Sequence, residues 1–228
     1  MRVGVLFSGG KDSTYATWIV QQQGWEVAAL VTVRPHSQDS QVFHSPNVEW
    51  THLQAEALGL GHQVIESKED DDLADLQHAL SNMKRERKLL GVVTGAVASD
   101  YQKTRFDNLC DSTGLKSYSP LWHKNPRVLI EDLKKAGMRI VLTAVAAKGL
   151  DASWLGKELS DSDWSRLETL SKNHGFHLAG EGGEYESLVL DAPFFRKTII
   201  IERSRVEWKG DAGRLVIEKS SSREKLRN

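Results

Sequence analysis

The amino-acid sequence predicts an α/β fold: a doubly wound parallel sheet followed by a smaller α+β unit that contains antiparallel strands. Over residues 1–148, short runs rich in valine and isoleucine alternate with amphipathic stretches, which is typical of stacked βα units. Beyond residue 148 the strands follow one another directly, and a glycine turn at residues 210–213 joins two of them, which indicates antiparallel pairing. We therefore expect two domains, residues 1–148 and 149–228.

The first domain is expected to hold five strands separated by helices. The expected strands are residues 3–7, 27–33, 63–66, 92–98 and 140–146, and the expected helices are residues 12–23, 45–59, 72–90, 99–114 and 125–137. Serine or asparagine at the helix starts and glycine at the ends fix most of these bounds. Because strand–helix–strand crossovers require parallel strands, we place all five strands in one sheet.

The helix predicted over residues 72–90 has the clearest pattern. Its leucines and Met83 recur every three or four residues, as on the buried face of a helix. Acidic residues surround its first turn and basic residues fill its last turns, so both ends complement the helix dipole. We interpret these charges as helix electrostatics and not as a nucleic-acid site.

The second domain is expected to begin with a helix over residues 163–173. Four short strands follow, at residues 188–190, 197–202, 206–208 and 215–218. The polar tail, residues 220–228, is expected to be frayed and solvated.

Composition excludes several classes of protein. The chain has 228 residues, with 30 basic against 31 acidic side chains, so no general electrostatic attraction to nucleic acid is expected. Its single cysteine, Cys110, cannot form an internal disulfide, which favours a reducing compartment. The apolar start is too short for a signal peptide, and no apolar run approaches the roughly 20 residues that span a bilayer. We expect a cytoplasmic protein without a membrane partner.

A candidate phosphate-binding loop, SGGKDS at residues 8–13, follows the first strand directly. Glycines allow close approach of backbone amides to a ligand, and the start of a helix favours an anion. Lys11 would supply a mobile positive charge, and Asp12 could hold Mg²⁺ on the phosphates. A tight turn with a helix cap is the plainer alternative, but six consecutive suitable residues favour phosphate binding. The loop matches neither the Walker A motif nor the dinucleotide fingerprint.

This loop resembles the pyrophosphate loop (PP-loop) of the N-type ATP pyrophosphatases. The resemblance implies a HUP-like fold, cleavage of ATP between the α and β phosphates, and transfer of AMP to a substrate oxygen. Positive charge and amides at the loop would then stabilise the departing pyrophosphate.

Four further segments narrow the resemblance to the diphthine–ammonia ligase family: residues 43–47, 95–105, 120–122 and 181–187. The similarity extends from the first strand to about Phe194. Lys103, Asp107 and Ser187 stand where arginine, glutamate and threonine are common, which keeps each charge or hydroxyl. Members from eukaryotes often carry further C-terminal domains, so this short chain is expected to be of the archaeal type.

The family resemblance implies an activity and partners. It implies ATP- and Mg²⁺-dependent amidation of diphthine on translation elongation factor 2, by way of an acyl adenylate with release of AMP and pyrophosphate. Residues 1–148 would bind ATP and residues 149–228 the substrate. Because Cys110 is the only thiol and lies in a predicted helix, free ammonium is the expected nitrogen donor. No stable nucleic-acid partner is expected, and whether the chain forms a homodimer is open.

Three carboxylates, Glu181, Glu184 and Glu186, crowd the glycine turn of one of these segments. Their mutual repulsion requires a compensating cation unless the loop is simply exposed. The resemblance makes them candidates to bind the quaternary ammonium of diphthine, with Tyr185 as a cation–π partner. Ammonium and Mg²⁺ are alternatives, and the sequence leaves the choice open.

Ser99 and Asp100 follow a predicted central strand, where open α/β sheets bind their ligands. Arg105 lies one turn beyond Tyr101 and could reach the same pocket, although an ordinary capped helix is the alternative. The assigned catalytic residues are Lys11, Asp12, Ser99, Asp100 and Arg105. The assigned nucleotide-binding residues are Ser8, Gly9, Gly10, Lys11, Asp12, Ser13 and Gly95, with Asp12 as metal ligand. The assigned substrate-binding residues are His44, Asn47, Tyr101, Trp122, Glu181, Gly182, Gly183, Glu184, Tyr185 and Glu186.

Two other functions remain as alternatives to the ligase. A tRNA-modifying enzyme of the same superfamily with lysidine-type chemistry needs no thiol, whereas thiolation commonly uses paired cysteines, which are absent. A non-catalytic ATP-binding protein could share the same α/β scaffold.

Overall fold

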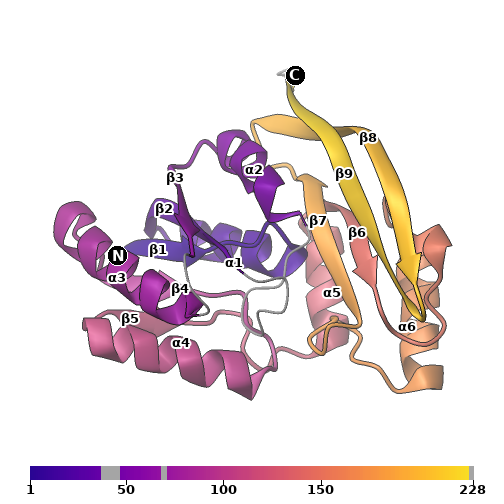
Figure 1. Ribbon diagram of the computed structural model, residues 1–228, viewed down its shortest axis with the longest axis horizontal. Coiled ribbons are helices and arrows are strands. Elements are labelled where there is room, and N and C mark those ends of the chain that lie inside the picture. Colours follow the sequence, from indigo (N-terminus) through magenta and orange to yellow (C-terminus); the bar gives the residue numbers. More distant parts are fainter. Residues whose placement is uncertain (37–46, 68–70, 226–228) are drawn as a thin grey trace.

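Two sheets form the framework of the protein, one parallel and one antiparallel (Figure 1). The computed structural model describes residues 1–36, 47–67 and 71–225. The parallel sheet has the strand order β3-β2-β1-β4-β5. Its strands are β1 (Arg2–Leu6), β2 (Glu26–Arg34), β3 (His62–Glu66), β4 (Gly91–Val93) and β5 (Lys116–Tyr118).

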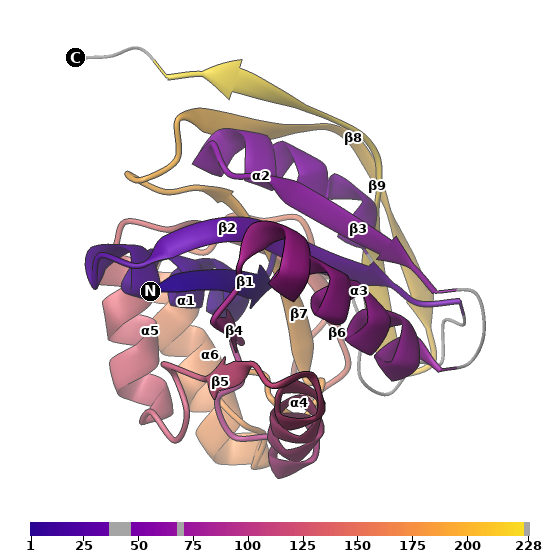
Figure 2. The ribbon, with the colours of Figure 1, turned by 90° about the vertical axis from the view of Figure 1, so that its left-hand side faces the viewer.

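Helices cover both faces of the parallel sheet, as predicted for a doubly wound fold. The helices α3 (Asp72–Arg87) and α4 (Asp100–Thr113) lie together over one face, and α1 (Lys11–Gln22) lies on the other (Figure 2). Successive residues of β1 point to opposite faces, so Val5 packs in the cluster on the α1 side and Leu6 packs with α3 and α4. The sheet is therefore buried on both sides.

The antiparallel sheet has the order β7-β6-β9-β8. Its strands are β6 (Arg139–Val145), β7 (Tyr185–Asp191), β8 (Lys197–Lys209) and β9 (Ala212–Glu224). The helices α5 (Pro126–Lys135) and α6 (Asp161–His174) pack against it through Leu129, Leu133 and Leu167. The remaining elements are α2 (Thr51–Leu58) and the 3₁₀ turns η1 (Val48–Trp50) and η2 (Ala152–Trp154).

The expectation that residues 140–146 belong to the parallel sheet is wrong. β6 pairs antiparallel with β7 and with β9. Its burial on both faces gives it the continuous apolar sequence of a parallel strand, so periodicity alone could not identify its partners. The sheets thus divide between β5 and β6, while the domain boundary at residue 148 stays a prediction.

Four other segments differ from expectation. The strand predicted over residues 92–98 ends at Val93, and residues 94–98 form a loop instead. The short strand β5 was not anticipated. The strands expected at residues 197–202 and 206–208 are one continuous strand with register shifts near Arg203. The tail expected to fray at residue 220 pairs in β9 as far as Glu224, because β8 supplies a partner for it.

The start of the helix predicted at residue 45 lies outside the described residues, and the described helical part begins at η1. None of the helices within the described ranges is both long and apolar enough to cross a membrane.

Candidate active site

A cavity of about 400 Å³ lies at the carboxyl ends of β1 and β4, lined by the loops that follow these strands. These strands are neighbours, but the chain continues from β1 toward β2 on one side and from β4 toward β5 on the other. Such a switch point is where open α/β sheets bind ligands. Thirteen predicted site residues line the cavity: Ser8, Gly10, Lys11, Asp12, Ser13, Gly95, Ser99, Tyr101, Glu181, Gly182, Gly183, Tyr185 and Glu186.

The phosphate loop is a tight turn that opens directly into α1. Gly9 has φ +78°, a conformation that favours glycine, and Gly10 is the N-cap residue of α1. The Ser13 hydroxyl oxygen accepts a hydrogen bond from the Ser8 amide at 3.3 Å. A Cβ on Gly95 would lie 2.7 Å from the Ser13 nitrogen. The loops after β1 and β4 therefore touch, and a side chain at residue 95 would separate them.

Lys11 is held by its neighbours, so the expectation of a mobile charge is wrong. Its side chain is only 3% exposed, and its Nζ donates to Asp12 Oδ2 at 2.7 Å and to the Ala179 carbonyl at 2.5 Å. The Nζ also lies 5.0 Å from the centre of the Tyr185 ring. Burial alone would lower the pKa of Lys11, but the Asp12 carboxylate nearby raises it overall. Lys11 is therefore a fixed, protonated cation.

Asp12 has the chemistry of a ligand for a hard cation. Its Oδ1 is buried and has no hydrogen-bond partner in the described parts of the chain. Burial raises the pKa of Asp12, although Lys11 opposes that shift. An unpartnered carboxylate oxygen suits Mg²⁺. The described residues contain no group of three or more acidic, histidine or cysteine side chains poised around one ion, so nucleotide oxygens and water would complete the coordination.

Backbone amides already occupy two of the three carboxylates of the 181–186 turn. Glu181 Oε2 accepts hydrogen bonds from the amides of residues 97, 98 and 99, at 3.1, 2.8 and 3.3 Å. The two oxygens of Glu184 accept from the His177 amide at 2.8 Å and the Gly182 amide at 2.7 Å. Both carboxylates thus hold loops in place, and Glu184 does not line the cavity.

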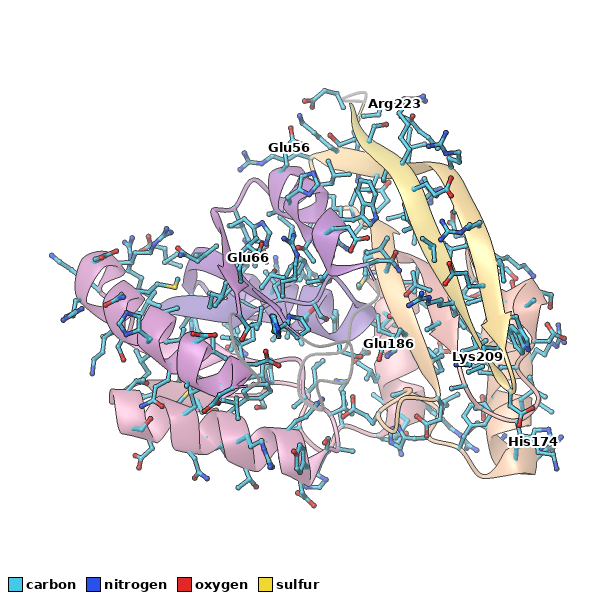
Figure 3. The ribbon with its side chains drawn as sticks, viewed as in Figure 1. Glu56, Glu66, His174, Glu186, Lys209 and Arg223 are labelled. Atoms are coloured by element: carbon cyan, nitrogen blue, oxygen red, sulfur yellow. The ribbon has the colours of Figure 1, made fainter. Side chains whose placement is uncertain are left out.

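Glu186 differs from its two neighbours. It lies on β7, where the antiparallel sheet adjoins the parallel one (Figure 3), and lines the cavity. No described residue donates a hydrogen bond to its carboxylate. Burial raises the pKa of Glu186 to about 7, with Lys11 opposing and Asp12 and Glu181 adding to the rise. Its carboxylate therefore gains and loses a proton near neutral pH.

Tyr185 is a wall of the cavity and has little freedom to enclose a ligand. The residue is buried, and its hydroxyl donates to the Leu178 carbonyl at 2.7 Å. Burial raises the pKa of Tyr185, so the phenol stays neutral. Its ring faces Lys11, whereas its cation–π contact with the substrate stays a prediction.

Ser99 begins α4 as predicted. Its side chain accepts a hydrogen bond from the Gln102 amide at 3.3 Å. Tyr101 is at the rim of the cavity, 42% exposed, and the Arg105 guanidinium stacks 3.4 Å from its ring centre. Asp100 and Arg105 do not line the cavity, and their catalytic roles stay predictions.

The remaining predicted substrate residues lie apart from the cavity lining. Asn47 is buried, and its side-chain nitrogen donates to the Leu215 carbonyl at 3.4 Å. The Trp122 ring packs against the His123 ring with centres 4.5 Å apart. Gly9, assigned to nucleotide binding, is also absent from the cavity lining. His44 is outside the described residues. The binding roles of these residues stay predictions.

Sequence reasoning missed Gln54, which ties the phosphate loop to the second sheet. Its Nε2 donates to the Gly9 carbonyl at 2.7 Å and to the Val189 carbonyl at 2.9 Å. The Lys11 amide also donates to Ser187 Oγ at 3.1 Å. Gln54 stands alone in a helix, so no local signal could have found it. Sequence reasoning also gave no role in the site to the apolar wall residues, among them Val31, Val33 and Phe106.

Comparisons with known proteins give one consistent family. The family models described as "Diphthamide synthase N-terminal domain" and "Diphthamide synthase C-terminal domain" match residues 1–117 and 125–222. A protein of Bos taurus named diphthine–ammonia ligase is 35% identical over 227 residues, covering 90% of this chain and 85% of its own length. A Schizosaccharomyces pombe protein of the same name is 37% identical over 224 residues, covering 90% of this chain and 37% of its own.

A solved structure from Methanocaldococcus jannaschii, described as a predicted subunit of tRNA methyltransferase, aligns with a TM-score of 0.45 and 19% identity. The alignment covers 85% of this chain and 98% of that one. At this level of similarity its description carries no weight for function.

Proposed function

The chain belongs to the diphthamide synthase family, and from this membership we propose that it is a diphthine–ammonia ligase. The reaction would convert diphthine on translation elongation factor 2 to diphthamide, with ATP and ammonium consumed and AMP and pyrophosphate released. One structural observation supports the proposed activity in addition to the family membership. The phosphate loop with its fixed Lys11 cation and the Glu186 carboxylate, which accepts no hydrogen bond from the described residues, line one cavity.

In this proposal the phosphates of ATP bind to the loop that follows β1. Ser8, Gly10 and Ser13, which line the cavity, would present amides and hydroxyls to the β and γ phosphates, and Gly9 would shape the turn that holds them. The start of α1 adds a favourable field. Lys11 would stabilise charge on the departing pyrophosphate. The apolar wall formed by Val31 and Val33 is the proposed seat of the adenine ring.

The charge of the cavity supports a requirement for Mg²⁺. One cation, Lys11, faces three acidic side chains, those of Asp12, Glu181 and Glu186, so a polyanion entering without a counter-ion would be repelled. Asp12, through its unpartnered Oδ1, is the proposed protein ligand of the ion. When bound, Mg²⁺ would neutralise charge on the phosphates and leaving group.

Activation of the substrate carboxylate explains the need for ATP. A carboxylate resists attack by an amine at neutral pH, whereas an acyl adenylate carries AMP as a good leaving group. In the first step a diphthine carboxylate oxygen attacks the α phosphorus and pyrophosphate leaves. In the second, ammonia attacks the carbonyl carbon and AMP leaves.

The substrate side of the site is proposed to come from the second domain, residues 149–228, together with the start of α4. Ser99, Tyr101 and the turn at residues 181–186 border the cavity opposite the phosphate loop. Trp122, which lies outside the cavity lining, is proposed to contact the incoming elongation factor, and Asp100 and Arg105 keep their proposed catalytic roles at the start of α4. The modified side chain of the elongation factor must therefore reach the rim of the cavity, which residues next to the parallel sheet and residues next to the antiparallel sheet both line.

The products of the reaction test this proposal. The chain is incubated with MgATP, ammonium and diphthine-bearing elongation factor 2, and nucleotides and factor are then analysed. We expect AMP and amidated factor in equal amounts, with neither formed when ammonium or the factor is omitted. ADP as the main product, or AMP release that requires tRNA instead of the factor, would refute the assignment.

A further inference from the structure

The 181–186 turn holds three carboxylates, and among them only that of Glu186 both lines the cavity and accepts no hydrogen bond from the described residues. Resting on the proposed ligase function, we propose that Glu186 is the catalytic base of the second step: its carboxylate binds ammonium and takes a proton from it. This role goes beyond substrate binding, because it assigns to one residue the production of the ammonia nucleophile.

Hydrogen bonding separates Glu186 from the other two carboxylates. Glu181 has one oxygen, Oε2, that accepts hydrogen bonds from three backbone amides, so its carboxylate is held against the loop at residues 97–99. Glu184 has an amide on each oxygen and does not line the cavity. Glu186 lines the cavity and accepts no hydrogen bond from the described residues, so its lone pairs are available to an N–H donor.

The groups facing Glu186 favour a small cation beside it. From α1 come Lys11 and Asp12, and from the preceding loop comes Glu181. The Lys11 Nζ is hydrogen-bonded to Asp12 and to the Ala179 carbonyl and not to Glu186, although its charge opposes the rise in the Glu186 pKa. The excess of acidic side chains attracts ammonium, and the raised pKa makes the Glu186 carboxylate a stronger base than an exposed glutamate.

The aromatic side chains of the cavity argue against a trimethylammonium site at Glu186. A quaternary ammonium has no N–H to donate and is usually held by open aromatic faces. Tyr185 already faces Lys11, and Tyr101 is covered by Arg105. Phe7 and Phe106 are buried in the hydrophobic clusters. Because both tyrosines already pair with a cation of the protein, the N–H donors of ammonium suit the Glu186 carboxylate better than a quaternary ammonium does.

The step balances as follows. Ammonium gives one proton to the Glu186 carboxylate, which leaves neutral ammonia and a carboxylic acid. The nitrogen lone pair then forms the C–N bond to the acyl adenylate carbonyl. As the tetrahedral adduct collapses, the C–O bond to AMP breaks, AMP leaves with the electron pair, and the nitrogen loses a second proton to solvent. Glu186 returns its proton to solvent before the next turnover.

The two half-reactions separate this role from substrate binding. In a Glu186→Gln variant, ATP–pyrophosphate exchange that depends on diphthine-bearing factor reports the first step and needs no ammonium. We expect exchange within about threefold of wild type. Amidation with ammonium should fall at least about 100-fold, the usual contribution of a general base. Hydroxylamine, which is largely unprotonated at neutral pH, should restore product formation as the hydroxamate.

Control variants make the result specific. Glu202→Gln removes an exposed carboxylate that pairs with Lys219 on the β8–β9 ribbon, and its amidation rate should be unchanged. Glu186→Asp should retain part of the ammonium-dependent rate. Amidation at the wild-type rate in Glu186→Gln, failure of hydroxylamine to rescue, or loss of exchange together with amidation would overturn the role of Glu186 as base. Absence of diphthine-dependent exchange in the wild type would instead refute the ligase function on which the inference rests.

Discussion

Lys11 and Asp12 form a buried ion pair within the phosphate loop. Replacing Lys11 by methionine leaves the Asp12 carboxylate buried without its partner, which for buried pairs costs about 3–5 kcal/mol. We expect Lys11→Met to lower the free energy of unfolding by about 3 kcal/mol in urea titrations and to abolish ATP–pyrophosphate exchange. The double variant Lys11→Met/Asp12→Asn should recover stability but not exchange. Wild-type stability in the single variant would show that the pair is not coupled in this way.

Gly95 is required because the loops after β1 and β4 touch. The Cβ of an alanine would meet the backbone of α1 at 2.7 Å, and backbone cannot move aside as a flexible side chain can. Gly95→Ala should weaken ATP binding at least tenfold, measured by calorimetry. The matched control is Gly61→Ala, whose Cβ has ordinary contacts of 3.5 Å or more. If Gly95→Ala and Gly61→Ala bound ATP equally well, a close contact between residue 95 and the start of α1 would be contradicted.

Cys110 has no access to substrate. It is buried against α3 and the parallel sheet, and burial raises the pKa of its thiol to about 11, so it is not a nucleophile at neutral pH. We expect Cys110→Ala to keep the amidation rate within twofold while losing about 1 kcal/mol of stability. A folded variant without turnover would implicate the thiol in nitrogen delivery.

The helix α4 is anchored by a distant residue as well as by its own cap. Ser99 caps it locally, and Glu181 places a negative charge at the amides that precede it, where the helix dipole favours an anion. Glu181→Ala should lower the free energy of unfolding by about 1–2 kcal/mol, because three amides lose their acceptor. Ser99→Ala should cost about 1 kcal/mol. Urea titrations measure both.

If these two losses add in the double variant, the cap and the carboxylate act independently. We expect a smaller combined loss, because both groups order the same turn. Strict additivity would argue against a shared role in positioning the start of α4.

At the level of the whole molecule, Glu186 should make stability depend on pH. Burial raises its pKa from 4.5 to about 7, so the folded chain binds this proton more tightly than the unfolded chain. The stabilisation that this tighter proton binding gives the folded chain is therefore complete below pH 4.5 and is lost as the pH rises through about 7. Glu186→Gln should gain about 1–3 kcal/mol over wild type between pH 5 and pH 8. If the unfolding free energies of wild type and Glu186→Gln changed with pH in parallel, the shifted pKa of Glu186 would be contradicted.

Local signals predicted most elements and the phosphate loop. Helix ends were fixed by particular residues: Asn125 accepts from two amides at the start of α5, and Gly114 ends α4 at φ +63°. These signals work because capping and turn conformations depend on neighbours within one helical turn. The SGGKDS loop was likewise identified because strand, glycines and helix start are contiguous.

The sequence by itself therefore determined the βα units, the phosphate loop and the candidate carboxylates. Tertiary structure alone decided that β6 joins the antiparallel sheet, that Lys11 is fixed, and that Glu186, unlike Glu181, keeps a free carboxylate. The reason is physical: strand pairing, burial and hydrogen-bond satisfaction depend on groups far apart in the chain. The Lys11 amide bonds to Ser187, 176 residues away, and Glu181 bonds to the amide of Val97, 84 residues away. No local pattern encodes such contacts.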